Sequence, residues 1–151
     1  MQTAPALRPS GSARLFVALW PDAATRARLA ARRDALRLPP TARRVSDANL
    51  HATLHFIGAF ERERIPALWA KLAKVPVRPV DLCTTTLATW KGGTVVLQLE
   101  SDAALAALHA DLGVALGACD IALDTRPYSP HVTLARGASG MDLPSAAEPL
   151  D

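Results

Sequence analysis

The segment NLHATLHFIGAF, residues 49–60, decides how the chain folds, because polar and apolar side chains alternate along it. His51, Thr53 and His55 occupy every second position. A β-strand sends successive side chains to opposite faces, so we expect these three to share one face and Phe56 to point into the core. The segment therefore predicts a half-buried strand whose polar face is turned to water or to a ligand.

The composition fits one globular domain. Of the 151 residues, 50% are hydrophobic and 21% are charged, and the formal net charge is +3. A chain of this length can bury a real core, and its mildly basic balance is compatible with an anionic ligand without requiring one. The two isolated cysteines, Cys83 and Cys119, are typical of a reduced protein rather than a disulfide scaffold.

Targeting, membrane and cofactor signals are all missing from the sequence. No apolar run approaches the roughly 18 residues of a membrane span, and the N-terminal stretch does not resemble a signal peptide. We therefore expect a cytoplasmic protein, a monomer, with no membrane association. The sequence also contains no P-loop, no GxGxxG and no KxDG motif, so we expect no cofactor and no dependence on ATP or NAD.

The chain divides into a flexible tail at residues 1–13, a single domain at 14–136, and a loop or tail at 137–151. Strands and helices alternate within the domain, and a Lys-Gly-Gly turn after Trp90 predicts an antiparallel hairpin. We therefore expect an α+β fold. The expected elements are a strand at 14–20, a helix from Asp22 to about Leu38, a strand from His51 that Gly58 closes, a helix around 65–72, a hairpin over 77–100, a leucine-striped helix capped by Ser101 and ended by Gly117, and a strand at 131–136.

An internal repeat is the most informative feature of the sequence. The pattern His-x-Thr-apolar occurs as HATL from His51 and again as HVTL from His131, 80 residues later. In each copy the threonine, Thr53 or Thr133, lies two residues after the histidine and so on the same strand face. Two lobes related by a pseudo-twofold axis would bring two imidazoles and two hydroxyls together across a cleft.

This set of groups suits displacement at phosphorus. One imidazole can accept the proton of a nucleophile while the other donates a proton to the leaving oxygen, because histidine titrates near neutrality. Threonine hydroxyls can donate hydrogen bonds to the phosphate oxygens on which charge builds up. Such a reaction requires no metal ion.

Two other interpretations of the histidines were weighed. A single His-x-Thr on a strand is more often structural than catalytic, but duplication favours a shared site. A zinc site built from His51, His55 and His131 would need two ligands that stand about 13 Å apart on an extended strand, which disfavours it. We expect His55 at the cleft rim in contact with substrate, and His109 on a helix in a structural or surface role.

The segments NLHATLHFIG and RPYSPHVTLAR, with RLFVALWP near the start, resemble the motifs of the 2H phosphoesterases. Within them the chain is similar to the RNA 2′,3′-cyclic phosphodiesterases, also called 2′-5′ RNA ligases or LigT-like proteins. The resemblance covers residues 14–136. It implies a bilobal α+β fold in which two small antiparallel sheets face a central cleft, with helices outside. Members of this family usually continue for several tens of residues more, so we expect the C-terminal end to be truncated.

The resemblance implies hydrolysis of terminal 2′,3′-cyclic phosphates on RNA or nucleotides to 2′-phosphates. His51 would be the general acid, His131 the general base, and the threonines would hold the phosphate. The substrate contacts would come from a second set of residues: Arg136, Tyr128, His55 and Phe56, with Tyr128 the better candidate for base stacking and Trp90 a weaker one.

Several other activities use the same residues. The motifs describe the phosphate and not its neighbours, so 2′-5′ phosphodiester bonds and ADP-ribose cyclic phosphate are alternative substrates, and ligation is a possible reverse reaction. A non-catalytic module that binds RNA ends is the alternative of a different class.

Overall fold

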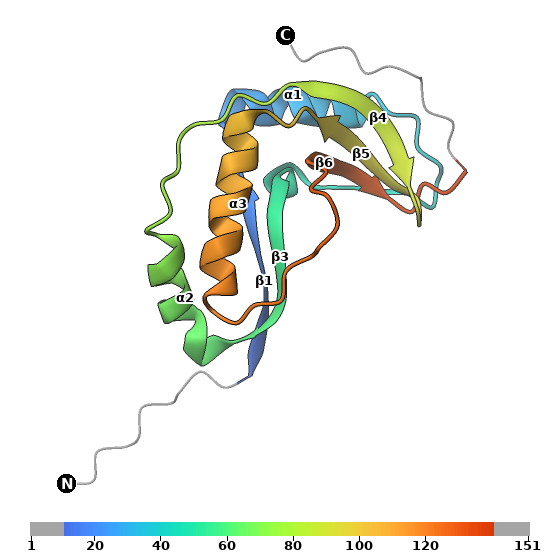
Figure 1. Ribbon diagram of the computed structural model, residues 1–151. Helices are drawn as coiled ribbons and strands as arrows, with labels where there is room; N and C mark the ends of the chain where they lie inside the picture. The colour runs from blue at the N-terminus through green and yellow to red at the C-terminus, as the bar shows by residue number, and fades with distance from the viewer. Residues whose placement is uncertain (1–10, 141–151) are drawn as a thin grey trace, which may run out of the picture.

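A computed structural model describes residues 11–140 of the chain, so residues 1–10 and 141–151, which make up most of the expected tails at 1–13 and 137–151, lie outside it. Eleven elements follow one another along the described residues (Figure 1): β1 (Ser12–Leu19), α1 (Ala23–Asp34), β2 (Arg43–Arg44), the 3₁₀ turn η1 (Asp47–Asn49), β3 (Ala52–Glu61), the 3₁₀ turn η2 (Arg62–Arg64), α2 (Ile65–Leu72), β4 (Thr84–Trp90), β5 (Thr94–Leu99), α3 (Ala103–Gly117) and β6 (His131–Arg136). The predicted α+β class is confirmed.

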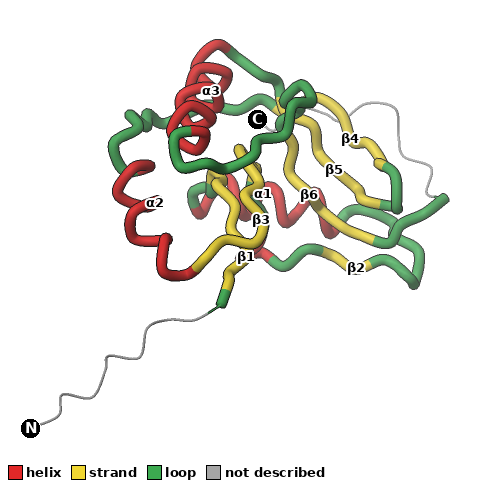
Figure 2. The backbone as a smooth tube through the Cα atoms, turned by 60° about the horizontal axis from the view of Figure 1, so that its bottom comes forward, coloured by secondary structure: helices red, strands yellow, loops and turns green. Residues whose placement is uncertain are grey.

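The strands form one open antiparallel sheet in the order β1-β3-β6-β5-β4, with the short β2 beside β6. Two groups of strands make up this sheet (Figure 2), and a single residue pair between β3 and β6, Ala52 with Val132, joins them. The expected two small sheets are therefore two halves that meet at one point.

The two halves repeat one arrangement of elements. In the first, β1 is followed by α1 and then by β3, which pairs with β1; in the second, β5 is followed by α3 and then by β6, which pairs with β5. A pseudo-twofold axis at the junction of β3 with β6 relates them. Each helix covers the other half of the sheet: Leu29 of α1 lies in a cluster with Leu97 and Val132, and Leu108 of α3 packs with Leu54.

The leucine stripe on α3 is confirmed, because all four of its members are buried: Leu105, Leu108, Leu112 and Leu116. The cap of this helix is Asp102 and not Ser101 as predicted, since a carboxylate oxygen of Asp102 accepts a 2.7 Å hydrogen bond from the amide of Leu105. Asp102 caps more effectively because it stands at the extended residue directly before the first helical one.

The ends of two other predicted elements also differ. Helix α1 ends at Asp34, four residues before the expected Leu38. Strand β3 continues through Gly58, where φ is +79°, because the chain bulges there and does not end. The β4–β5 hairpin is confirmed, and the amide of Gly93 donates a 3.0 Å hydrogen bond to the carbonyl of Trp90 across its turn. No helix within the described part of the chain is long and apolar enough to span a membrane.

Candidate active site

The two repeated histidines are held in the same way. The Nδ1 atom of His51 lies 2.7 Å from the carbonyl oxygen of Asn49, and the Nδ1 atom of His131 lies 2.8 Å from the carbonyl oxygen of Ser129. A carbonyl can only accept a hydrogen bond, so each Nδ1 carries the proton and donates it. Each Nε2 is therefore the atom left to exchange a proton with a substrate.

The register of the central strands brings the two repeats together. Ala52 pairs with Val132 in an antiparallel ladder. One residue to either side, this register sets His51 across from Thr133 and Thr53 across from His131. This register therefore places the histidine of each repeat across the ladder from the threonine of the other.

The two repeats match beyond the His-x-Thr motif itself. From each histidine, six consecutive residues are half-buried, buried, half-buried, buried, buried and exposed. The ladder skips one residue in each repeat, Leu54 opposite β1 and Leu134 opposite β5, so a β-bulge follows both threonines. A bulge adds one residue and shifts the alternation of the side chains after it. The sixth residues, Phe56 and Arg136, consequently return to the face of the histidines.

The bulge corrects two predictions made from simple alternation. Phe56 was predicted to point into the core, but its side chain is 57% exposed. His55 was expected at the cleft rim; it does line a pocket together with Thr53 and His131, but only 8% of its surface is exposed. The same shift gives Arg136 an exposed position at the end of β6, next to Arg43 of β2. Phe56 and Arg136 stand at equivalent places in the two halves.

His55 points toward α3 and away from the other strand histidines. Its Nε2 donates a 2.7 Å hydrogen bond to the carbonyl of His109, and its ring stacks on the ring of His109 with 4.1 Å between centroids. The zinc set of His51, His55 and His131 is therefore not assembled. Among residues 11–140 no group of three His, Cys, Asp or Glu side chains is arranged to hold a metal ion.

Tyr128 extends this stack to a third ring. Its ring lies 4.0 Å from that of His109, and its hydroxyl donates a 2.9 Å hydrogen bond to the carbonyl oxygen of Thr53. Burial raises the pKa of Tyr128 to about 12. Burial lowers the pKa of His109, and the charge of His55 adds to the decrease. His109 already covers one face of the Tyr128 ring. The clearest contribution of Tyr128 is therefore to anchor Thr53 through its hydroxyl group.

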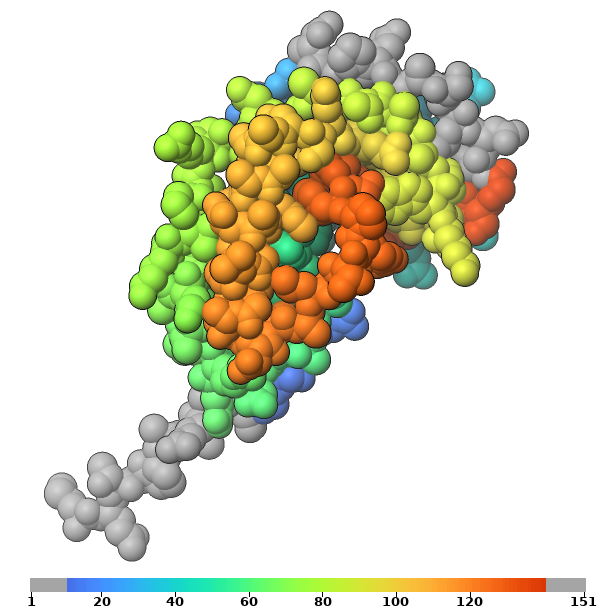
Figure 3. Space-filling model, viewed as in Figure 1, coloured from blue at the N-terminus to red at the C-terminus, as the bar shows by residue number. Residues whose placement is uncertain are grey.

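A pocket of about 330 Å³ opens between α3, β3 and the loop before β6. Figure 3 shows this hollow with β3 at its floor. Thr53 and His131 line it together, and so do Phe56 and Trp90. A larger hollow of about 670 Å³ begins on the other side, at His51. His131 and Thr53 thus line the smaller hollow, and His51 lines the larger one.

Sequence reasoning did not identify Arg126, which also lines the smaller pocket. Its guanidinium group is held by Asp124 through three hydrogen bonds of 2.6 to 3.1 Å. This contact lowers the pKa of Asp124 to about 2, chiefly because the Arg126 side chain donates to the carboxylate. Arg126 is the first residue of the RPYSPH segment, five positions before His131, and this position in the motif could have identified it as a candidate.

Aromatic rings border both histidines, and those beside His51 are exposed while the one beside His131 is half-buried. His51 lies between Phe16 and Trp20, with ring centroids 5.0 and 4.9 Å away, and Trp90 meets the ring of His131 edge-on at 4.3 Å. Of these three rings, the sequence pointed only to that of Trp90, as a weaker stacking candidate. Aromatic rings of this kind can both orient an imidazole and present a surface to a nucleobase.

Comparison with known proteins agrees with this geometry. A model of the 2′-5′ RNA ligase superfamily matches residues 17–151, and the chain therefore belongs to this superfamily of 2H phosphoesterases. Membership supports an enzyme that acts on phosphodiester bonds. A search among curated proteins gave no match.

Solved structures share the fold. E. coli LigT complexed with 3′-AMP is 26% identical, with a TM-score of 0.76 over 90% of this chain and 80% of LigT. A structure described as a phosphoesterase is 25% identical, with a TM-score of 0.74 over 93% of this chain and 80% of its own. The PDE domain of MHV ns2 is 14% identical, with a TM-score of 0.59 over 92% and 91% of the two chains, and shows likeness of fold alone.

Proposed function

We propose that this protein hydrolyses 2′,3′-cyclic phosphates at RNA 3′ ends, or on nucleotides, to leave a 2′-phosphate. The observation that carries the proposal is the duplicated arrangement of His51 and His131, in which each Nδ1 donates to a backbone carbonyl and each Nε2 is left for the substrate. Two such imidazoles supply both proton transfers that displacement at phosphorus requires.

The proposed reaction uses the two histidines in complementary protonation states. Nε2 of His131 accepts a proton from water as the water oxygen attacks phosphorus. The bond from phosphorus to the 3′ oxygen breaks, and Nε2 of His51 donates its proton to that oxygen. The product is a 2′-phosphate and a free 3′-hydroxyl group, and a proton transfer between the histidines through solvent restores the starting state. No metal ion takes part in any of these steps.

The remaining side chains would stabilise and orient the substrate. The hydroxyls of Thr53 and Thr133 would donate to the non-bridging phosphate oxygens, where negative charge increases in the transition state. Arg136 would attract the phosphate, and Phe56 offers an exposed ring for a base. E. coli LigT has been crystallised with 3′-AMP and with ATP, which supports a nucleotide-shaped ligand for this chain as well.

The test is turnover of an RNA oligonucleotide with a 2′,3′-cyclic phosphate end by the native protein and by His51→Ala and His131→Ala. General acid–base catalysis contributes roughly 10²–10⁴-fold, so each variant should lose at least ~10²-fold in kcat while it still binds the RNA. Near-native kcat in either variant would refute the assignment. Binding without turnover by the native protein would point instead to an RNA-end binding module.

A further inference from the structure

The carbonyl group that orients His51 belongs to a short segment with little support of its own. Asn49, which accepts the proton of His51 Nδ1, is the last residue of η1. This turn has three residues and no side-chain cap, and its residues are exposed. A 2.9 Å hydrogen bond from the Asn49 amide to the carbonyl of Ser46 closes it. The orientation of the candidate acid therefore depends on what holds the start of η1.

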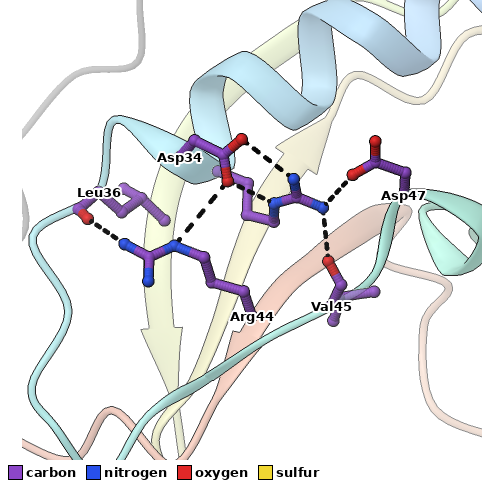
Figure 4. A network of polar contacts seen from close by, with 6 residues as sticks. Asp34, Leu36, Arg44, Val45 and Asp47 are labelled. Atoms are coloured by element: carbon purple, nitrogen blue, oxygen red, sulfur yellow. Dashed lines mark hydrogen bonds and ion pairs between the residues drawn. The ribbon is translucent and has the colours of Figure 1, made fainter.

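Two contacts hold that start: the amide of Val45 donates a 2.9 Å hydrogen bond to the carbonyl of Leu134, and the side chain of Arg33 of α1 holds Val45 and Asp47. One nitrogen of its guanidinium group donates to the carbonyl of Val45 at 2.7 Å and to the carboxylate of Asp47 at 2.6 Å. The other side of the group is paired with Asp34 at 2.9 and 3.1 Å (Figure 4). Arg33 is buried, with 8% of its surface exposed, whereas the side chains of Asp34 and Asp47 are 57% and 65% exposed. The charge-assisted bonds therefore hold a buried guanidinium group against carboxylates that water also reaches.

We infer that Arg33 is a positioning residue for His51, acting through Asp47 and the η1 turn on the carbonyl of Asn49. The inference rests on the proposed function, in which His51 is the general acid. The line of contacts runs from the guanidinium to Asp47, along two residues of η1 to the Asn49 carbonyl, and from there to Nδ1.

The other half of the molecule has a counterpart built from different chemistry. There, helix α3 contributes His109, whose ring stacks on Tyr128 in the loop that leads to Ser129 and His131. In each half, a side chain of the helix, Arg33 of α1 or His109 of α3, contacts the loop whose carbonyl accepts the proton of the catalytic histidine candidate. An ion-pair cluster does this for one histidine and a ring stack does it for the other.

Arg44 provides a matched control. It belongs to the same network, where it donates to the carbonyl of Leu36 at 3.0 Å and lies 3.9 Å from the carboxylate of Asp34 (Figure 4). Neither of these contacts reaches Val45 or Asp47. The charged groups around Arg33 are thus Asp34, Asp47 and, one step further, Arg44, and only Asp47 connects to η1.

The experiment compares Arg33→Gln, Asp47→Ala and Arg44→Gln with the native protein. Arg33→Gln and Asp47→Ala should each lower kcat roughly tenfold with little change in KM, because the carbonyl that orients His51 is then held less firmly. Arg44→Gln should leave kcat and KM unchanged. Since the Asp47 side chain is largely exposed, Asp47→Ala keeps the test valid if Arg33→Gln does not fold.

A second measurement is independent of turnover. Long-range ¹H–¹⁵N NMR spectra of the free protein should show the His51 ring as the Nδ1–H tautomer in the native and Arg44→Gln proteins, and a mixture of tautomers in Asp47→Ala. An unchanged tautomer and an unchanged kcat in Asp47→Ala would overturn the inference. If the native protein fails to turn over any cyclic phosphate, the proposed function fails, while the NMR result still decides whether Arg33 orients His51.

Discussion

The bulge after each His-x-Thr motif makes a quantitative prediction about Phe56 and its neighbour Leu54. In a regular strand, Phe56 would be a core residue, and Phe56→Ala would cost about 3–5 kcal/mol of unfolding free energy. In the structure 57% of its surface is exposed, so less than half is covered. Full burial of a large apolar side chain contributes about 1.5–3 kcal/mol, so we expect Phe56→Ala to cost about 1 kcal/mol.

Leu54→Ala is the matched variant. Leu54 is 4% exposed and packs against Leu105, Leu108 and Leu112 of α3, so its truncation should cost about 2–5 kcal/mol. Urea denaturation followed by circular dichroism measures both losses, with the slope m unchanged if each variant still unfolds in one step. A loss of 3 kcal/mol or more in Phe56→Ala would refute the shifted alternation, and with it the return of Phe56 and Arg136 to the strand face of the histidines.

Three further predictions concern the site and its support. Thr53→Val should reduce kcat by the equivalent of roughly 2.7–4 kcal/mol, as for loss of one oxyanion donor, and an unchanged rate would remove Thr53 from the site. Tyr128→Phe keeps the ring stack but removes the hydrogen bond to the Thr53 carbonyl, so the free energy of unfolding, measured by heat or urea, should fall by about 1–3 kcal/mol. An unchanged free energy of unfolding would mean that water replaces the hydroxyl. Burial lowers the pKa of His109 below 6.5, so the unfolded chain takes up that proton first as the pH falls. The unfolding free energy should therefore decrease as the pH drops from about 6.5 until the folded ring is protonated, and His109→Leu should remove this dependence.

Much of the fold could be predicted because it follows from local patterns. Alternation identified the strand that begins after His51, leucine spacing identified α3, and a Lys-Gly-Gly turn identified the β4–β5 hairpin. The repeat of His-x-Thr then suggested a pseudo-twofold arrangement, which the pairing of Ala52 with Val132 reproduces. These features depend on the order of residues within a few turns or strand positions, and the sequence contains that information directly.

The positions after each motif could not be predicted from alternation. Leu54 and Leu134 resemble ordinary strand residues, and the bulge at each depends on how β3 and β6 pair with β1 and β5. The destination of His55 depends in turn on that bulge and on the ring of His109, 54 residues away in the chain. Such contacts join distant segments, so a local pattern does not encode them.

The orienting groups were also hidden from sequence reasoning. The carbonyls of Asn49 and Ser129 are backbone atoms, and any residue type could supply them. Arg33 looked like one of several charged residues on a helix surface, but its burial depends on how α1 packs beside the loop that precedes His51. The candidate catalytic side chains could therefore be proposed from the sequence, whereas the contacts that orient them required the structure.

The most direct test of the central claim is to identify the product formed from an RNA that ends in a 2′,3′-cyclic phosphate. The native protein is incubated with this RNA in excess EDTA, and ³¹P NMR distinguishes the 2′-phosphate from the 3′-phosphate. We expect the 2′-phosphate to form despite EDTA, because His51 and His131 carry out both proton transfers. A 3′-phosphate product, or turnover that EDTA abolishes and added metal restores, would contradict the proposed roles of these two histidines.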